Sequence, residues 1–327
     1  MQNVQVADAG VQLSGVRPAA ISLRNLRVSY GRFEAVKGIS LDIPEGEVFG
    51  FIGPNGAGKS STFRVLATLQ PKFQGQAYVC GLDVLRQPQK VRDVMGFVPD
   101  FFGVYEDLTS LEYLHFFAAA YRIPTAKRKG TIDDVLTLTD MTHKAHSPVD
   151  GLSRGMKQRL ALARVLLHDP KVLLLDEPSS GLDPRARIEM RELLKALREM
   201  GKTILISSHI LSELAQLCTR IGIIELGRMV AEGSLNEIYR QLQLMRVVHI
   251  RADNAGPELL EKVRAIPGVE SIEQQVDRWA LRLREEELSI ADLHAGLVAA
   301  GARLTMLQPE AMDMETAFMK LTEGKTA

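Results

Sequence analysis

The stretch Gly53-Pro54-Asn55-Gly56-Ala57-Gly58-Lys59-Ser60 fits the phosphate-binding pattern G-x-x-x-x-G-K-[ST] at every fixed position. Residues 48–52 before it are apolar and favour a strand, and residues 61–69 after it favour a helix. The glycines can adopt backbone angles closed to other residues, so successive N–H groups can turn toward phosphate oxygens at the positive end of the helix dipole. The stretch therefore predicts a P-loop that binds the phosphates of a nucleotide.

Side chains within and near this stretch have predicted roles toward the nucleotide. Lys59 can reach the terminal phosphates, and the Ser60 hydroxyl can bind Mg²⁺. The neighbouring Ser61 is also predicted to bind the nucleotide. Tyr30, at the end of an earlier strand, can stack its ring on the adenine, although a tyrosine standing alone at this place would be read as a surface residue.

Length and composition limit the classes of protein. The chain has 327 residues, which suggests two domains at roughly 150 residues per domain. Lysine plus arginine and aspartate plus glutamate both number 40, so the net charge is zero and nothing global indicates a nucleic-acid partner. No apolar run of about 18 residues predicts a membrane span, and residues 1–20 resemble a flexible tail and not a signal peptide. Cys80 and Cys218 lie outside any C-x-x-C spacing, which predicts buried free thiols and no zinc site.

The residues around the P-loop indicate a mixed α/β fold with a helical insertion. Strands are predicted at 21–28, 39–43, 75–81 and 95–100, and the first two form an antiparallel pair ahead of the P-loop strand. From residue 109 to about 148 the pattern becomes helical, with Ser110 as a candidate cap. This insertion could dock a partner or be a plain helical elaboration, and the pattern favours neither.

A second candidate phosphate site follows the insertion. Residues 151–159 open a helix that runs to about residue 167, with Ser153 placed as its cap and Gly155 just inside it. Because the N-terminus of a helix favours anions, this stretch predicts another anion site.

Two strands carry polar side chains at their carboxyl ends. Residues 172–175 are continuously apolar and run into Asp176 and Glu177, and residues 204–209 repeat the pattern with His209 at the tip. A helix is predicted between them, so strands and helices alternate as in a doubly wound parallel sheet. In such sheets ligands bind at the carboxyl ends of the strands.

These side chains have complementary chemistry toward a nucleotide. Asp176 can hold Mg²⁺ together with Ser60, since the ion prefers carboxylate and hydroxyl oxygens beside phosphates. Glu177 is the candidate base that polarises a water for in-line attack on the γ-phosphate, and His209 can contact that phosphate or position the water. Taken singly, an Asp-Glu pair could be a helix cap and a histidine an ordinary residue, but their order and strand-tip positions favour catalysis.

Together these motifs resemble those of the ATP-binding subunit of an ATP-binding cassette (ABC) transporter. In family order they are Tyr30, the Walker A loop at 53–60, the signature Leu152-Ser153-Arg154-Gly155-Met156, Walker B with its glutamate at 172–177, the D-loop Ser180-Gly181-Leu182-Asp183 and the switch His209. The resemblance covers roughly residues 21–235. It implies a P-loop NTPase core of ABC type with an antiparallel β subdomain and a helical subdomain at about 101–165, binding ATP and Mg²⁺.

The resemblance also implies that two such subunits hold ATP between them, head to tail. Ser153 and Gly155 of one subunit would contact the γ-phosphate held by the P-loop of the other, and Asp183 is expected to contribute to the nucleotide site. Arg154 departs from the family pattern by replacing the first signature glycine, and its side chain could be tolerated near the γ-phosphate or point away. Asp100 stands where the family usually has glutamine. It could meet Mg²⁺ through water, and an acidic residue here resembles type-two exporter subunits.

Residues 236–327 are predicted to form a small α+β accessory domain after the cassette domain at 21–235. Its β-α-β-β-α-β pattern is that of a ferredoxin-like sheet with helices on one face. A last helix at 314–321 resembles the closing segment of drug and polysaccharide exporter ATPases. The domain could regulate, dimerise or bind a ligand, and a packing or dimerisation module is the simplest interpretation.

These features predict an ATPase that powers export through separate permease subunits, without a nucleic-acid partner. The resemblance implies that the cassettes form a homodimer. The predicted location is cytoplasmic, peripheral on the inner face of the cell membrane. The alternative is a soluble ABC-type ATPase with a regulatory or non-transport role. Related translation factors usually carry two cassettes and repair proteins a long coiled coil, and neither feature occurs in this sequence.

Overall fold

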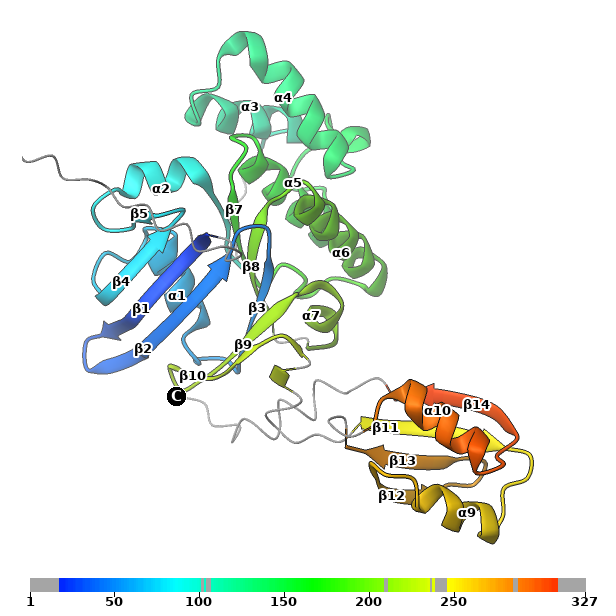
Figure 1. Cartoon of the computed structure of the whole chain (residues 1–327). Coiled ribbons are helices and arrows are strands. Elements are labelled where there is room, and N and C mark those ends of the chain that lie inside the picture. The colour runs from blue at the N-terminus through cyan, green and yellow to red at the C-terminus, as the bar shows by residue number, and fades with distance from the viewer. Residues whose placement is uncertain are drawn as a thin grey trace, which may run out of the picture. The chain divides into compact units, whose positions relative to one another are not determined.

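The computed structural model describes residues 18–100, 103, 107–208, 211–235, 237–238, 246–284 and 288–310. These residues belong to two compact units, and the chain passes from the first to the second after Ser234. The first unit contains the P-loop, and Figure 1 shows its sheets, its helices and the separate elements of the second unit. The predicted final helix at 314–321 and residues 1–17 lie outside the described residues.

The first unit begins with an antiparallel sheet of order β2-β1-β4-β5. Its strands are β1 (Ala19–Tyr30), β2 (Phe33–Pro44), β4 (Gln74–Val79) and β5 (Leu82–Asp83). β1 and β2 extend several residues beyond the predicted strands, because their paired registers run almost to the turn at 31–32. β1 already starts at Ala19, so the tail predicted to reach residue 20 is slightly too long.

The main sheet has six strands in the order β10-β9-β3-β8-β7-β6. They are β3 (Val48–Ile52), β6 (Met95–Val98), β7 (Val172–Asp176), β8 (Thr203–Ser208), β9 (Arg220–Glu225) and β10 (Arg228–Gly233). Strands β9 to β6 are parallel and β10 is antiparallel to β9. The parallel order brings the carboxyl ends of β3, β8, β7 and β6 to one edge, as predicted for a ligand site.

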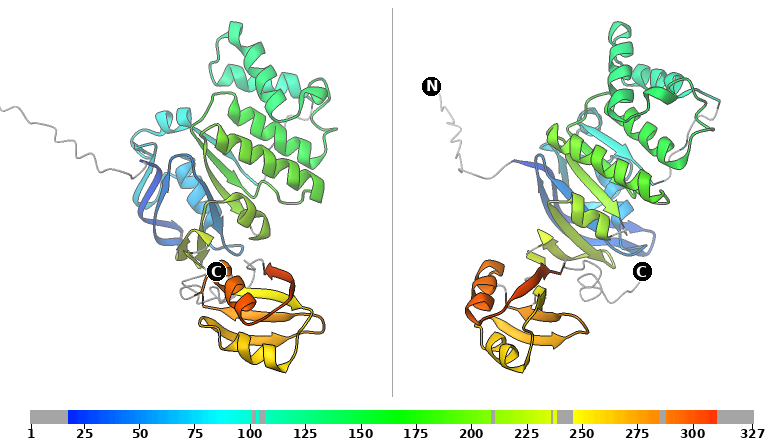
Figure 2. Two further views of the ribbon diagram at one scale, coloured as in Figure 1. Left: turned by 45° about the vertical axis from the view of Figure 1, so that its right-hand side comes forward. Right: turned by 90° about the vertical axis from the view of Figure 1, so that its right-hand side faces the viewer.

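Helices cover both faces of this sheet. The helices of the first unit are α1 (Lys59–Leu66), α2 (Pro88–Val94), α3 (Ser110–Ala120), α4 (Thr125–Leu138), the 3₁₀ turn η1 (Thr142–Lys144), α5 (Arg154–Leu166), α6 (Pro184–Glu199) and α7 (Leu211–Leu217). Helix α1 contacts β2 and β4 of one sheet and β7 of the other, whereas Figure 2 shows α5, α6 and α7 on the opposite face of the main sheet.

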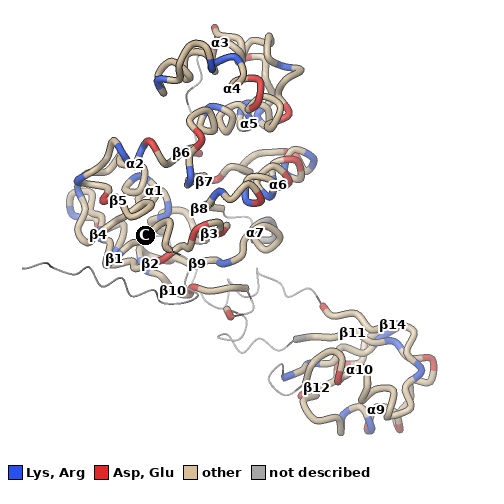
Figure 3. Tube along the Cα trace, turned by 45° about the horizontal axis from the view of Figure 1, so that its top comes forward, with Lys and Arg blue, Asp and Glu red and all other residues tan. Residues whose placement is uncertain are grey.

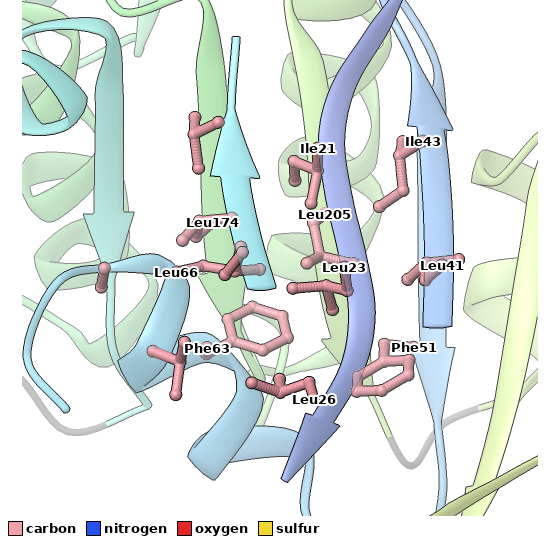
Figure 4. Packing of buried hydrophobic residues seen from close by; sticks show 14 of the residues in the cluster. Ile21, Leu23, Leu26, Leu41, Ile43, Phe51, Phe63, Leu66, Leu174 and Leu205 are labelled. Atoms are coloured by element: carbon pink, nitrogen blue, oxygen red, sulfur yellow. The ribbon is translucent and has the colours of Figure 1, made fainter. Parts of the chain in front are cut away.

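A hydrophobic core fills the space between the two sheets. Figure 4 shows Leu23 and Leu26 of β1 facing Leu205 and Phe51 of the main sheet, with Phe63 of α1 among them. All of these side chains are at most 1% exposed. Burying a side chain of this size contributes about 1.5–3 kcal/mol, so the core holds α1 firmly and fixes the loop that precedes it.

Helices α3 and α4 form the predicted insertion. The cap of α3 is Thr109 and not Ser110: its hydroxyl accepts the Glu112 N–H, and the Glu112 carboxylate accepts the Thr109 N–H at 2.8 Å. This reciprocal pair is a capping box. Ser110 is instead fully buried as the first residue of the helix, with its N–H bonded to the Ser147 carbonyl.

The second unit has the predicted β-α-β-β-α-β order. Its elements are β11 (Arg246–Ala252), α9 (Pro257–Arg264), β12 (Val269–Gln274), β13 (Trp279–Leu283), α10 (Ile290–Ala299) and β14 (Leu304–Pro309). The strands form one antiparallel sheet of order β12-β13-β11-β14, the ferredoxin-like arrangement. Trp279, Leu281 and Leu283 pack with Leu293 and Leu297 of α10 in a core of its own.

Charged residues of both signs are spread over the two units, and the two cysteines are partly buried. Figure 3 shows Lys and Arg interspersed with Asp and Glu along both units. Cys80 and Cys218 are free thiols, as predicted. They were predicted to be buried, but each is only partly buried. Among the described residues, no helix combines the length and the apolar character needed to cross a membrane.

Candidate functional site: a P-loop beside two carboxylates

The P-loop wraps the N-terminus of α1 because its glycines permit it. Gly56 and Gly58 have φ angles of +81° and +105°, in the region that L side chains rarely adopt. A Cβ on Gly58 would also lie 2.6 Å from the Ala35 carbonyl oxygen, and one on Gly53 only 2.3 Å from that of Ile224. Side chains at these two positions would therefore push the loop away from β2 and β9.

Lys59 is held inside the loop. It is the first residue of α1, is 6% exposed, and its ammonium donates to the carbonyls of Gly53 at 2.6 Å and Pro54 at 3.2 Å. The ammonium also lies 3.9 Å from the Glu177 carboxylate. Burial lowers the pKa of Lys59, and attraction by Glu177 and Asp176 offsets this only in part.

Asp176 and Glu177 are positioned by a residue of the neighbouring strand. Asp176 ends β7 opposite Ser207 of β8, and the Ser207 hydroxyl donates to the Asp176 carboxylate at 2.5 Å. The same hydroxyl accepts the Glu177 N–H at 2.9 Å, and that N–H also approaches the Ser207 carbonyl at 3.2 Å. Glu177 has a φ angle of +53°, so the chain turns sharply after β7. Ser207 thus fixes the point from which both carboxylates project.

A cavity of about 250 Å³ opens above the loop. Of the predicted nucleotide-binding and catalytic residues, its lining contains Tyr30, Asn55, Gly56, Ala57, Gly58, Lys59, Ser60, Ser61, Asp100 and Glu177. Gly53 and Pro54 take part through the carbonyls that hold Lys59. Asp176 lies behind this lining with 6% of its surface exposed.

The donor set fits Mg²⁺ bound with a nucleotide. Ser60 offers a hydroxyl, and Asp176 offers carboxylate oxygens of the kind that hard cations prefer. Within the described residues no three His, Cys, Asp or Glu side chains gather into a metal site. An ion here would therefore take its remaining ligands from phosphates and water, as Mg²⁺ commonly does. Asp100 contributes a further carboxylate to the wall of the cavity.

The second predicted phosphate site lies elsewhere in the same unit. Ser153 caps α5 by accepting the Met156 N–H at 3.3 Å, as its position in the sequence predicts. Asp183 caps α6 by accepting the Ala186 N–H at 2.9 Å. Ser153, Gly155 and Asp183 do not line the P-loop cavity, so one chain does not bring the two predicted phosphate sites together.

Two residues singled out in the sequence, Arg154 and His209, remain to be placed, and two residues of the site were not predicted. Arg154 points toward the D-loop, where its guanidinium lies against Gly181. The predicted switch His209 lies outside the described residues. Phe33 and Ser207 were missed by sequence reasoning: Phe33 lines the cavity beside Tyr30 and is 46% exposed, and Ser207 is fully buried. A second aromatic residue three positions after Tyr30 is visible in the sequence, whereas only the pairing of β7 with β8 reveals Ser207.

Comparison with known proteins identifies the family. The ABC transporter family model matches residues 36–180. The chain is 31% identical to the linearmycin resistance ATP-binding protein LnrL of Bacillus subtilis, over 94% of this chain and 99% of that protein. It is 33% identical to a Nod factor export ATP-binding protein I of Cupriavidus metallidurans, over 93% of this chain and 97% of that protein. A solved ATP-binding subunit of an ABC transporter superposes with a TM-score of 0.63 at 29% identity, covering 69% of this chain and 94% of that one.

The fold and the cavity thus define a P-loop nucleotide-binding ATPase. The chain belongs to the ABC transporter family, as an ATP-binding subunit. ATP and Mg²⁺ are its cofactors, in agreement with the phosphate loop and the hard oxygen donors beside it. The predicted fold class, activity and cofactors are confirmed.

Proposed function

We propose that two copies of this chain bind Mg-ATP head to tail and use its hydrolysis to drive export through separate membrane permease subunits. Support comes from relatives named for export or resistance that align over more than nine-tenths of the chain. That alignment extends well beyond the family match at 36–180 and includes the second unit. The proposed location is the cytoplasmic face of the cell membrane, as a peripheral subunit.

Within this function we propose Glu177 as the catalytic base. The observation that carries the assignment is the placement of its carboxylate on the cavity wall, 3.9 Å from the Lys59 ammonium. A carboxylate there can polarise a water and accept its proton. Asp176 and Ser60 would hold Mg²⁺, with Asp100 acting through water, and Mg²⁺ when bound would neutralise charge on the β- and γ-phosphates.

We propose further that Ser153 and Gly155 complete the site of the other copy, since both lie outside the cavity of their own chain. His209 would act on the γ-phosphate, and Tyr30 and Phe33 would flank the base. The division into a cassette domain at 21–235 and an accessory domain at 236–327 is part of the same proposal. The accessory domain would then contribute to association or regulation.

A fractionation experiment tests the proposed function. Tagged full-length chain, expressed at native level in its own host, should sediment with membranes and be released by detergent together with a multi-span protein. Glu177→Gln should show an ATP-dependent dimer by sedimentation, while Lys59→Ala, the matched control, should stay monomeric with ATP. A chain that remains in the soluble fraction and binds no multi-span protein would support the alternative of a non-transport ATPase.

A further inference from the structure

The first turn of α5 carries a positive charge where helix electrostatics favour a negative one. Arg154 is the first residue of α5, and no acidic side chain lies in that turn. A cation here faces the positive end of the helix dipole. Within the described residues, the ion pairs of α5 use Lys157 and Arg159 and not Arg154. Arg154 is exposed to solvent, and its guanidinium also approaches a neighbouring loop.

That contact is with the loop 178–183, which joins β7 to α6. A Cβ built on Gly181 would lie 2.6 Å from both Cζ and Nη1 of Arg154, and 3.0 Å from its Nε. The guanidinium therefore covers the space above the Gly181 backbone. Gly181 has a φ angle of +67°, which favours glycine, and a side chain there would displace the guanidinium.

The next residue of α5 approaches the same segment. A Cβ on Gly155 would lie 3.1 Å from the Ala186 Cβ and 3.8 Å from Cδ2 of Leu182. Further along, an ion pair between Arg159 and Glu189 joins α5 to α6. The start of α5 is thereby packed against the loop and the first turn of α6.

The loop itself starts at the proposed base. The Ser180 N–H donates to the Glu177 carbonyl at 3.0 Å, and the Leu182 N–H donates to the Ser179 carbonyl at 3.3 Å. Both bonds are local, and the end of the loop is fixed to α6, where Leu182 is buried and its carbonyl accepts from the Arg187 guanidinium at 3.0 Å. The contact with Arg154 comes from a different helix and reaches the loop at Gly181.

We propose that Arg154 is a positioning residue that couples the start of α5 to the loop 178–183, and through it to Glu177. The inference rests on the proposed two-copy function, in which the start of α5 meets the nucleotide of the other chain while Glu177 serves its own. A shift of α5 on meeting phosphate would then move the loop beside the base of the second site. Arginine suits this role because its planar guanidinium stacks on a flat surface, which a lysine ammonium does not.

Amide hydrogen exchange of the full-length, nucleotide-free chain tests the contact directly. In Arg154→Ala and Arg154→Lys, the amides of Ser180 and Leu182 should exchange about three- to tenfold faster, because the loop loses its contact with the Arg154 guanidinium. Gly181→Ala displaces the guanidinium from the other side and should give the same change. The matched control is Arg86→Ala, which removes an arginine whose side chain is 87% exposed on a different part of the unit. Unchanged exchange in all three test variants, or parental exchange in Arg154→Lys, would overturn the proposal.

Steady-state ATP hydrolysis separates coupling from simple structure. Arg154→Ala and Arg154→Lys should lower kcat about three- to tenfold and reduce the Hill coefficient for ATP toward one, with KM within about twofold of the parent, since Arg154 does not line the cavity. Parental kcat and cooperativity in both Arg154 variants would refute the coupling. A parent chain without turnover would instead contradict the proposed function, and the exchange measurement would still decide the contact.

Discussion

Removing the hydroxyl of Ser207 should both destabilise the first unit and impair hydrolysis. The side chain is fully buried, donates to the Asp176 carboxylate at 2.5 Å and accepts the Glu177 N–H at 2.9 Å. In Ser207→Ala the amide keeps its approach to the Ser207 carbonyl, but the carboxylate loses its donor. A hydrogen bond to a charged group contributes about 1.5–3 kcal/mol, so we expect the free energy of unfolding to fall by about 2 kcal/mol.

Thr139→Val is the matched control for this change. Its hydroxyl is also buried but donates to the neutral Val135 carbonyl at 2.7 Å, in the helical insertion. A bond of that kind contributes only about 0.5–1.5 kcal/mol. Thr139→Val should therefore destabilise less than Ser207→Ala. It should leave turnover at the parental value, because Thr139 does not line the P-loop cavity.

Two spectroscopic signals can locate the effect of Ser207→Ala. The only tryptophan of the chain, Trp279, lies in the core of the second unit, so its fluorescence reports on that unit while far-UV circular dichroism reports on both. We expect the dichroism midpoint to fall by roughly 4–8 °C without nucleotide, and the Trp279 transition to stay in place. Turnover should fall about 10- to 100-fold as the carboxylates lose their alignment. A variant that is no less stable than Thr139→Val and hydrolyses ATP at the parental rate would refute the role given to Ser207.

Four further predictions follow from the site and the two units. Glu177→Gln should still bind ATP and accumulate an ATP-bound dimer, while hydrolysis falls by roughly a hundredfold or more; unchanged turnover would remove Glu177 from the role of base. Lys59→Ala should abolish ATP binding at concentrations that saturate the parent. Because burial lowers the pKa of Lys59 and phosphate raises it again, binding by the parent at alkaline pH should take up protons, seen as a buffer-dependent enthalpy in calorimetry. Tyr30→Ala should weaken ATP binding by about 1–3 kcal/mol. Phe33→Ala should weaken it by a similar amount only if both rings contact the base. Titrating each variant with ATP and with a triphosphate that lacks the base would show which rings contact the base. A chain stopped near Tyr239 should remain soluble and keep parental affinity for Mg-ATP while losing ATP-dependent association; weak ATP binding by a folded truncation would sink the division into two units.

The motifs that define the site could be recognised in the sequence because each depends on short-range chemistry. Gly58 and Lys59 act within one loop, and their backbone conformation and charge are properties of adjacent residues. The apolar run of β7 and the carboxylates that end it are likewise contiguous. Alternation of strands and helices then sufficed to predict the parallel sheet and its ligand-binding edge.

Cap and boundary errors show the limit of such reasoning. Ser110 and Thr109 are both good capping residues, and the sequence alone does not say which one begins α3. The structure decides for Thr109 because Ser110 is buried against the segment near Ser147. The lengths of β1 and β2 were underestimated for a similar reason, since their outer residues are strands only through pairing with each other.

The sequence by itself determined the family, the P-loop, the candidate base and the two-unit order of elements, because these follow from residue types at fixed short spacings. Only the tertiary structure decided which distant residues support them. Ser207 meets Asp176 because β8 lies beside β7 in a particular register, and Arg154 meets Gly181 because α5 packs against α6. Both contacts join residues about thirty positions apart, and such contacts are set by strand order and helix packing, which no local pattern of residues encodes.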